Sequence, residues 1–261
     1  MSGLALQPSQ DKRKACFYLM NPIIVIPSRL ASTRLPNKPL AEIGGKPMIL
    51  QVALRARASG LGPVLVASGD REILDVLEGH DIAGVLTDPA LPSGSDRVHA
   101  ALEDYDPQGT HDVVINLQGD LPLVAPQTLS SALLPVTRGF DIGTLVAPVE
   151  TDEEAQRVSV VKAACAFAPG QDVARALYFS RQVIPWGEGP LWHHVGVYAW
   201  RREMLARFVA LAPSPLERRE SLEQLRALEA GMTIGCAAID EAPLGVDTPE
   251  DLMRIHQVLG A

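Results

Sequence analysis

Four basic side chains fall within one short stretch near the start of the chain: Arg29, Arg34, Lys38 and Lys46. Only one acid lies among them, although the 261-residue chain carries a formal net charge of -8. The stretch follows the apolar run 23–26, which predicts a β-strand, so the cations stand at the carboxyl end of a strand, where open α/β sheets bind ligands. Arginine offers a bidentate fork and lysine a point charge. This mixture favours a ligand with several anionic oxygens, such as a polyphosphate.

Two aspartates are expected at the ends of secondary-structure elements. Asp120 follows the run 113–117, whose β-branched residues predict a buried central strand, and Asp247 comes just before the cap of the last predicted helix. Taken singly, each is explained as a turn or cap residue. Mg²⁺ takes oxygen ligands and usually one or two carboxylates, with phosphates and water completing its shell. Beside the basic stretch, the pair therefore favours a metal and triphosphate site.

Three further groups of polar residues could contact a ligand. His194 and Tyr198 are four residues apart on a predicted strand and so share one face, with Gly196 leaving room between them; a packed core pair is the simpler alternative. The segment 93–97, SGSDR, predicts a polar loop whose backbone groups could read a base. On a later helix, three acids are typical of a solvated face: Glu217, Glu220 and Glu223.

The order of apolar runs and helical patterns predicts an α/β fold. In the first half this alternation indicates a mostly parallel sheet, with strands over 23–26, 64–67, 85–86 and 113–117 and helices over 47–60 and 70–77. After residue 143, longer strands with alternating faces predict a mixed or antiparallel extension: 144–149, 158–167, 173–179 and 193–200. Capping boxes at Ser214 and Thr248 begin two helices, the first running to Leu228.

Composition limits the class of protein. With 47% hydrophobic residues and a mean hydropathy of +0.10, the chain can bury a sizeable core. Its net charge argues against sequence-independent binding to nucleic acid or to an anionic membrane, since only one short segment is basic. Cys16, Cys165 and Cys236 are odd in number and lack CxxC spacing, so they predict neither a disulfide framework nor a zinc site. The reduced cytoplasm fits this cysteine usage best.

The chain is expected to form one domain over residues 20–261, preceded by a disordered extension over residues 1–19. A basic and then apolar order at the start has the form of a secretory signal, but Asn21-Pro22 interrupts it and its apolar part serves as the first strand. No run approaches the ~18 apolar residues that a membrane span needs. Met20 is a natural alternative start.

Seven segments, in order between residues 27 and 252, together resemble one enzyme family: PSRLASTRLPNKPL, SGSDR, NLQGDLP, YFSRQVIPW, HVGVYAWR, PSPLERRESLEQLR and GVDTPEDL. The family is that of the 3-deoxy-manno-octulosonate (Kdo) cytidylyltransferases of lipopolysaccharide assembly. The resemblance implies a nucleotide-diphospho-sugar transferase-like fold, with a three-layer sandwich around the sheet. It also implies a cytoplasmic homodimer, with its contact within 143–200, that uses Mg²⁺ to join CTP and Kdo into CMP-Kdo and pyrophosphate.

The resemblance also assigns roles by motif position. Arg29 and Lys38 would meet the triphosphate, with Arg34 beside them. Asp120 and Asp247 would hold Mg²⁺ and, with the first two cations, form the catalytic set. Because phosphoryl and nucleotidyl transfer depend on positioning and charge, we expect no nucleophilic side chain and assign no general base.

A second set of residues would contact the acid sugar: Gln118, Arg181, His194, Tyr198, Glu223 and Gln224. Ser93 and Gly94 would lie near the cytosine. The chain departs from the family pattern in three places: Leu121 follows the metal aspartate where the family has an acid, Gly69 stands in place of an acid after the second strand, and Leu91-Pro92 replaces a polar pair. These departures bear on fine specificity more than on the class of reaction.

Two alternatives remain open at this point. The first is a cytidylyltransferase for another acid sugar, such as 8-amino-Kdo or a nonulosonate. The second is a nucleotide-sugar-binding homologue without catalysis, for which Leu121 and Gly69 would be marks of decay. The presence of both Asp120 and Asp247 speaks against the second alternative.

Overall fold

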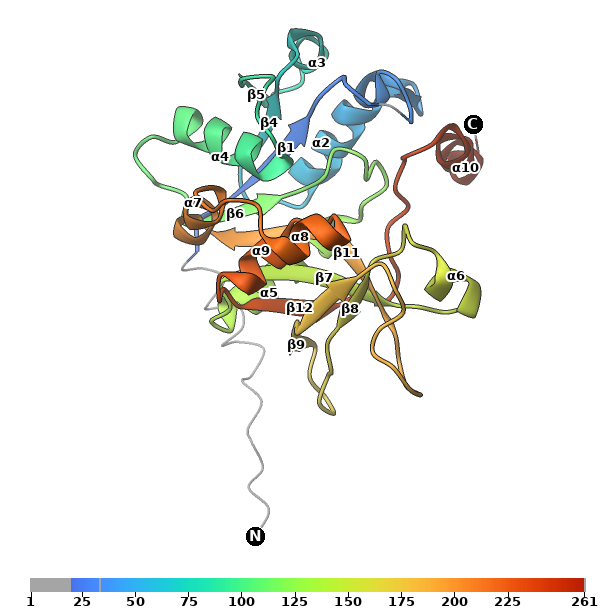
Figure 1. Ribbon diagram of the computed structural model, residues 1–261. Coiled ribbons are helices and arrows are strands. Elements are labelled where there is room, and N and C mark those ends of the chain that lie inside the picture. Colours follow the sequence, from blue (N-terminus) through green and yellow to red (C-terminus); the bar gives the residue numbers. More distant parts are fainter. Residues whose placement is uncertain (1–19, 33, 261) are drawn as a thin grey trace.

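The computed structural model describes residues 20–32 and 34–260, so the extension expected over residues 1–19 lies outside the described residues. Ten strands form one sheet in the order β5-β4-β1-β6-β11-β7-β12-β9, with β8 paired to β11 and β10 paired to β8 (Figure 1). The strands are β1 Pro22–Ser28, β4 Val64–Ser68, β5 Ala83–Leu86, β6 Val113–Asn116, β7 Ile142–Pro148, β8 Lys162–Ala164, β9 Val173–Arg175, β10 Tyr178–Ser180, β11 Trp192–Arg201 and β12 Ile234–Ala238, with β2 Glu42–Ile43 and β3 Lys46–Pro47 as a separate ribbon.

The first half of the sheet is parallel, as predicted. β1 lies between β4 and β6, and both pairings are parallel, as is that of β4 with β5. β11 then runs antiparallel between β6 and β7. Tyr198 of β11 stands opposite Asn116, the last residue of β6, so the earlier residues of β11 extend past the end of β6. The start of β11 therefore lies at the edge where β1 and β6 end.

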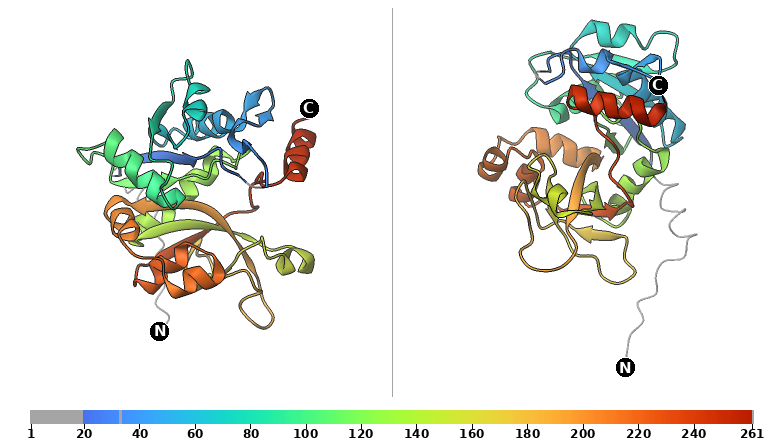
Figure 2. Two further views of the ribbon diagram at one scale, coloured as in Figure 1. Left: turned by 45° about the horizontal axis from the view of Figure 1, so that its top comes forward. Right: turned by 90° about the vertical axis from the view of Figure 1, so that its right-hand side faces the viewer.

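Helices cover both faces of this sheet and complete three layers (Figures 1 and 2). They are η1 Lys38–Leu40, α2 Met48–Ala58, α3 Arg71–Asp75, α4 Gly94–Tyr105, α5 Pro126–Thr137, α6 Asp152–Gln156, α7 Arg202–Val209, α8 Pro215–Glu220, α9 Gln224–Glu229 and α10 Pro249–Leu259. One buried cluster joins α2 and α5 to one face of the sheet, and a second joins α4, α7 and α9 to the other. The predicted fold class is confirmed. Within the described part of the chain, no helix is long and apolar enough to cross a membrane.

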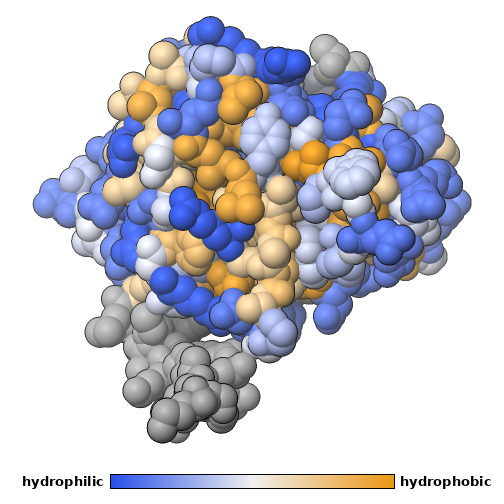
Figure 3. Space-filling model, turned by 60° about the horizontal axis from the view of Figure 1, so that its bottom comes forward, coloured by the Kyte–Doolittle hydropathy of each residue, from blue (hydrophilic) through white to orange (hydrophobic). Residues whose placement is uncertain are grey.

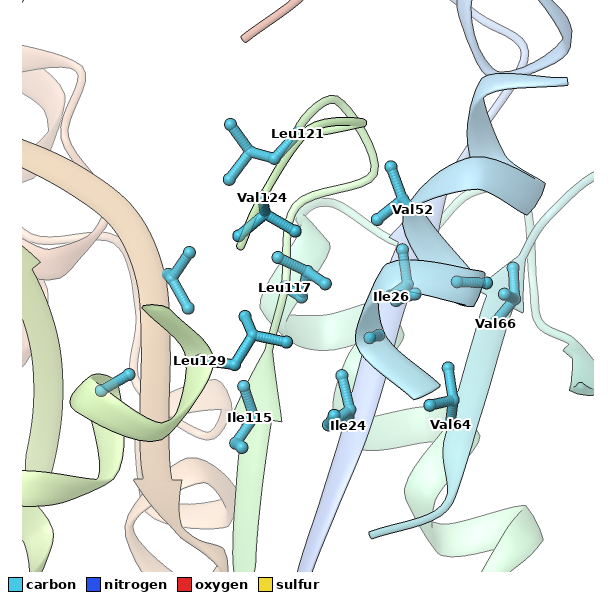
Figure 4. Close-up of a cluster of buried hydrophobic side chains, with 14 of the residues drawn as sticks. Ile24, Ile26, Val52, Val64, Val66, Ile115, Leu117, Leu121, Val124 and Leu129 are labelled. Carbon is cyan, nitrogen blue, oxygen red and sulfur yellow. The ribbon is translucent and has the colours of Figure 1, made fainter. Parts of the chain in front are cut away.

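Aliphatic side chains from neighbouring strands fill the first of these clusters (Figure 4). Ile24 and Ile26 of β1 point to one face because side chains alternate along a strand, and Val64 and Val66 of β4 do the same beside them. Val52 of α2 packs onto this surface and is fully buried. Each such burial contributes about 1.5–3 kcal/mol. The packing holds the two strands, and hence the loops that follow them, in fixed positions.

Both predicted capping boxes are confirmed. Ser214 accepts a hydrogen bond from the amide of Glu217 at the start of α8, and the Glu217 side chain accepts one from the Ser214 amide. Thr248 and Asp251 repeat this exchange at the start of α10. In each case a proline holds the first helical position, where the missing N–H costs nothing.

Three predictions for the first half are wrong in detail. The segment 93–97 is not a loop, because Ser93 caps α4 by accepting from the amide of Asp96, and the helix runs on to Tyr105. Neither α4 nor α5 was anticipated as a helix. The helix expected over 47–60 begins at Met48, with Pro47 as its N-cap, and the one expected over 70–77 is the shorter α3.

The second half differs from prediction in three elements. The strand expected over 158–167 is reduced to β8, and the one expected over 173–179 is divided into β9 and β10. The helix expected from Ser214 to Leu228 breaks at Ser221, whose φ of 54° lies in the left-handed region. Because that conformation cannot continue a right-handed helix, the segment becomes two short helices, α8 and α9.

Candidate active site

A cavity of about 410 Å³ opens at the carboxyl ends of β1 and β6. Eight of the residues singled out from the sequence line it: Arg29, Arg34, Lys38, Ser93, Gly94, Gln118, Asp120 and Asp247. The first three follow β1, and Ser93 and Gly94 begin α4, which packs against β1. Four separate segments thus bring their polar residues to one edge of the sheet.

Lys38 joins the two aspartates at the floor of this cavity. Its Nζ donates to Asp120 Oδ2 at 2.9 Å and to Asp247 Oδ1 at 2.8 Å. Burial by itself lowers the pKa of Lys38, but the attraction of Asp120 and the hydrogen bonds to both carboxylates outweigh it, so the pKa is raised. Arg34 adds a second cation, with Nη2 3.1 Å from Asp247 Oδ1. The two predicted metal ligands are therefore neighbours.

The backbone fixes this pairing of aspartates. The amide of Val246, next to Asp247, donates to the carbonyl of Asp120 at 3.0 Å. The Asp251 carboxylate at the start of α10 accepts from the amides of Asp247 and Thr248 at 3.1 and 3.0 Å. The turn after β6 and the segment before α10 are thus joined directly.

The donors at this position suit a Mg²⁺ ion shared with a substrate. Among residues 20–32 and 34–260, no group of three or more His, Cys, Asp or Glu side chains could hold a metal by itself. Asp120 and Asp247 supply two carboxylates, with side chains 30% and 46% exposed. Mg²⁺ characteristically takes one or two carboxylates and completes its shell with phosphates and water. The arrangement therefore fits the ion that the sequence predicted.

Arg97 is a cavity residue that the sequence analysis did not single out. It is 3% exposed, and its Nη1 donates to Thr87 Oγ1 and to the carbonyl of Asp88. Burial, and then repulsion by Arg29, lowers its pKa. Arg97 belongs to the SGSDR segment, but a loop at this position gives no indication that the arginine side chain is buried.

Arg97 also explains the glycine at position 69. A Cβ at Gly69 would lie 2.9 Å from Arg97 Nη1 and 2.9 Å from Pro89 Cα, so a larger residue would need both to move. The next residue, Asp70, supplies the acid, because its Oδ2 accepts from the amide of Leu30 at 2.7 Å. Asp70 thus holds the loop that carries Arg29, and Gly69 is not a mark of decay at this site.

Leu121, the other departure beside the metal aspartate, belongs to the core. It is 8% exposed and packs in the same cluster as Leu117 and Val124 (Figure 4). Leu121 also lies next to Gly245, since a Cβ added at that glycine would be 3.7 Å from Leu121 Cδ2. Leu121 therefore supports the turn that presents Asp120 by hydrophobic packing.

A second group of predicted residues lies on β11. The ring centroids of His194 and Tyr198 are 5.5 Å apart. Gly196 lies beside Gln118, because a Cβ added at Gly196 would be 4.0 Å from Gln118 Cγ. His194 is 8% exposed, with Nε2 3.0 Å from Thr144 Oγ1. Burial lowers the pKa of His194 to about 3, and burial together with Glu223 raises that of Tyr198. Both side chains are neutral at pH 7.

Glu223 and Gln224 lie close to this group at the start of α9. Ser95 Oγ of α4 donates to Glu223 Oε2 at 3.0 Å. Glu223 Oε1 and Gln224 Nε2 are buried and have no hydrogen-bond partner among the described residues. Unpaired buried polar atoms are costly, so both atoms are suited to a polar ligand.

Arg181 is directed elsewhere. Its guanidinium donates to the carbonyls of Glu220, Val158 and Ser221 at 2.9, 3.0 and 3.2 Å, and its amide donates to the Glu220 carboxylate at 3.1 Å. The sequence analysis placed Arg181 among the sugar ligands, but here it holds the end of α8. No sequence signal separates these roles, because its partners are remote in the chain.

Comparison with known proteins points to one family. A model of the cytidylyltransferase family matches residues 23–234. The 3-deoxy-manno-octulosonate cytidylyltransferases of Parvibaculum lavamentivorans and Rhodospirillum centenum are 55% and 56% identical over 240 residues, each covering 92% of this chain and 93% of the relative. A solved structure of CMP:2-keto-3-deoxy-manno-octonic acid synthetase complexed with CTP superposes with a TM-score of 0.82 at 34% identity, covering 92% of this chain and 98% of the other.

Proposed function

This chain belongs to the 3-deoxy-manno-octulosonate cytidylyltransferase family, and we propose that it transfers CMP from CTP to the anomeric hydroxyl of Kdo. The observation that carries the proposal is the bridge from Lys38 to Asp120 and Asp247 in a cavity that also holds Arg29 and Arg34. Cations for a triphosphate and carboxylates for a metal meet there. The reaction is a nucleotidyl transfer, and the enzyme is a cytidylyltransferase.

The cations of the first loop bind the triphosphate. Arg29, Arg34 and Lys38 line one side of the cavity, and the amino end of α4, with Ser93 and Gly94, lines another. Backbone N–H groups at a helix start favour anions and polar acceptor atoms. Ser93 and Gly94 face the cytidine part of the nucleotide, so the α-phosphorus is placed between the loop and the start of the helix.

Asp120 and Asp247 would hold Mg²⁺, and a bound ion would supply positive charge to the phosphate oxygens on which negative charge gathers during transfer. Lys38 orients the two carboxylates through its hydrogen bonds to both. Asp70 holds the loop that carries Arg29, and Arg97 adds a buried cation to the lining of the same cavity.

The acid sugar lies on the β11 side, against Gln118, which lines the cavity. The other sugar contacts come from residues outside the cavity lining: His194, Tyr198, Glu223 and Gln224. The anomeric oxygen of the sugar attacks the α-phosphorus in line, the bond from that phosphorus to the bridging oxygen of pyrophosphate breaks, and the hydroxyl proton is released. No side chain acts as a nucleophile. His194 is neutral and positions the sugar rather than accepting its proton.

The enzyme acts in the cytoplasm as a homodimer and supplies activated sugar for lipopolysaccharide. Exposed apolar side chains within 143–200 support the dimer contact: Val158, Leu177 and Trp186, at 61%, 69% and 100% exposure. Figure 3 shows hydrophobic residues gathered on the face that comes forward when the bottom of Figure 1 is turned toward the viewer. Sedimentation of the purified protein tests this assembly, and a monomer at micromolar concentration would contradict it.

The reaction is tested by pyrophosphate release from CTP and Mg²⁺ with a panel of acid sugars. We expect the fastest release with Kdo, and none when Mg²⁺ is chelated. A preference for 8-amino-Kdo or a nine-carbon acid would replace the substrate but keep the reaction class. No release with any sugar, from a folded protein that still binds CTP, would favour the non-catalytic alternative.

A further inference from the structure

A kink between two short helices carries Glu223 toward α4. α8 ends at Ser221 in the left-handed region, and α9 begins three residues later. Arg226 of α9 ties the two helices together, since its Nε and Nη2 donate to the Glu217 carboxylate at 2.8 and 2.5 Å. Both side chains are mostly buried, at 8% and 12% exposure. A bidentate pair of this kind fixes orientation as well as distance, so the backbone of Glu223 is held in place.

The Glu223 carboxylate crosses from this kink to a different part of the fold. Its Oε2 accepts from Ser95 Oγ at 3.0 Å, and Ser95 is 3% exposed in the first turn of α4. The two residues before it, Ser93 and Gly94, line the nucleotide cavity. The Ser95 hydroxyl therefore links α4, which begins at the cavity, to Glu223. Burial raises the pKa of Glu223, and hydrogen bonding by Ser93 and Ser95 acts against that shift.

The second oxygen of the same carboxylate is free for a ligand. Among the described residues, Glu223 Oε1 is buried without a hydrogen-bond partner, and its nearest ionic neighbour is Arg226 Nη2 at 3.9 Å. A buried acceptor without a donor costs about 1–3 kcal/mol, which a sugar hydroxyl would recover. With Oε2 held by Ser95, the position of Oε1 is set before the sugar arrives.

We propose that Ser95 is a positioning residue for the acid sugar. From α4, the helix that begins at the nucleotide site, its hydroxyl holds the Glu223 carboxylate so that Oε1 faces a sugar hydroxyl. The inference rests on the proposed function, in which Glu223 contacts the sugar. Without the Ser95 hydroxyl the carboxylate is held less firmly about its last torsion, and part of the sugar's binding free energy is spent on ordering it. The nucleotide loses no contact.

The test separates the two substrates kinetically. Ser95→Ala is expected to raise KM for Kdo roughly tenfold, the loss typical of a hydrogen bond to a charged group, while the CTP dissociation constant measured by calorimetry changes less than about twofold. Ser95→Thr keeps the hydroxyl and is expected to restore KM to within about threefold of wild type. Ser130→Ala, on the exposed side of α5, is the matched control. Equal loss for CTP and Kdo, or no change for Kdo, would overturn the proposal.

A double-mutant cycle shows whether Ser95 acts through Glu223. If it does, Ser95→Ala adds nothing to the KM increase already caused by Glu223→Gln, because the oriented group is altered in both backgrounds. Independent, additive increases would mean that Ser95 contacts the sugar or distorts the site by another route, and the positioning role would be rejected.

NMR of the Glu223 side-chain carboxyl carbon tests the inference apart from catalysis. We expect its resonance to shift and broaden in Ser95→Ala relative to wild type, while amide exchange over residues 221–229 stays the same because Arg226 holds the backbone. Should wild-type protein release no pyrophosphate with any acid sugar, the proposed function fails, yet this measurement still reports on Ser95. An unchanged Glu223 resonance in the variant would contradict the inference.

Discussion

Asp120 and Asp247 share one ammonium group: Lys38 Nζ lies 2.9 Å from the first carboxylate and 2.8 Å from the second. Two like charges this close repel unless a cation stands between them. Lys38 therefore holds the pair together before a metal or a nucleotide is present. The same oxygens are those that would hold Mg²⁺ in the proposed function, so the carboxylates are already side by side before a metal binds.

The first prediction concerns Asp120. Replacing it by asparagine removes a negative charge from the metal position while preserving shape, so turnover should fall by at least about 100-fold, the loss typical of removing one electrostatic contact to the transition state. Pyrophosphate release measures the loss. Asp240→Asn, an exposed acid on the segment between β12 and α10, is the matched control and should keep wild-type activity. A fully active Asp120→Asn enzyme with an unchanged Mg²⁺ requirement would remove the metal assignment.

Lys38 and Lys46 should behave differently although both belong to the basic stretch. Lys38→Gln leaves two carboxylates facing each other and removes a phosphate ligand, so KM for CTP should rise by about tenfold or more. Lys46 is exposed in β3 and does not line the cavity, so Lys46→Gln should bind CTP as wild type does. Fluorescence or calorimetric titration with CTP checks both variants. Equal losses would show a general field effect instead of a specific contact.

Asp106 should contribute stability rather than activity. This carboxylate, 5% exposed, accepts from the amides of Thr110 and His111 and from Arg202 Nη1 at 2.5 Å. Asp106→Ala should lower the free energy of unfolding by about 2–3 kcal/mol, whereas Asp104→Ala, exposed on the same helix, should lower it little. Urea denaturation at pH 7 measures the difference.

The stability difference between wild type and Asp106→Ala should depend on pH. Burial alone would raise the pKa of Asp106, but its hydrogen bonds from Thr110 and His111 hold it far below the ordinary value of 3.8. A group whose pKa is lower in the folded state stabilises the fold above the unfolded pKa and loses that effect as pH falls. The stability gap between wild type and Asp106→Ala should stay constant from pH 7 to about 5 and narrow below about 4. A gap independent of pH down to 3 would contradict this origin.

His194 should remain neutral across the physiological range. Burial lowers its pKa to about 3, below that of the unfolded chain, so acid favours the unfolded state. Because the unfolded chain binds a proton at His194 and the folded protein does not, the free energy of unfolding should fall by about 2 kcal/mol from pH 8 to pH 5. His194→Gln should remove this part of the pH dependence. Ring nitrogen chemical shifts measured by NMR should not titrate between pH 8 and 5. A midpoint near 6.5 would show that the ring is accessible and chargeable.

Local sequence patterns predicted the elements with a strong period or a strong cap. The β-branched strands β1, β4 and β6 and the boxes at Ser214 and Thr248 follow from short-range chemistry, and the structure confirms them. α4 was missed because its first residues, Ser93 and Gly94, are typical of a loop, and α5 contains Pro135 within the helix. In both helices tertiary packing overrides weak local propensity.

The features of the site that could not be predicted from the sequence depend on contacts between residues far apart in the chain. The basic stretch and the two aspartates were recognisable because each stands at the end of an element. The link between Ser95 and Glu223 joins residues 128 apart, and Arg181 meets carbonyls about 40 residues away, so no spacing indicates either. Lys162 is similar: its fully buried side chain donates from Nζ to the carbonyls of Arg157, Val160 and Arg181. The observed strand β8 begins at this residue, four positions later than the expected strand.

The antiparallel strand β11 limits how this enzyme can move. It pairs with β6 on one side and with β7 and β8 on the other, so hydrogen-bonded sheet is continuous across the proposed positions of both substrates. Hinge bending across β11 would have to break or strongly twist these ladders, which costs free energy. Adjustment to the substrates is left to the parts mounted on the sheet, namely the loop after β1, the kink between α8 and α9, and the segment that carries Asp247 to α10.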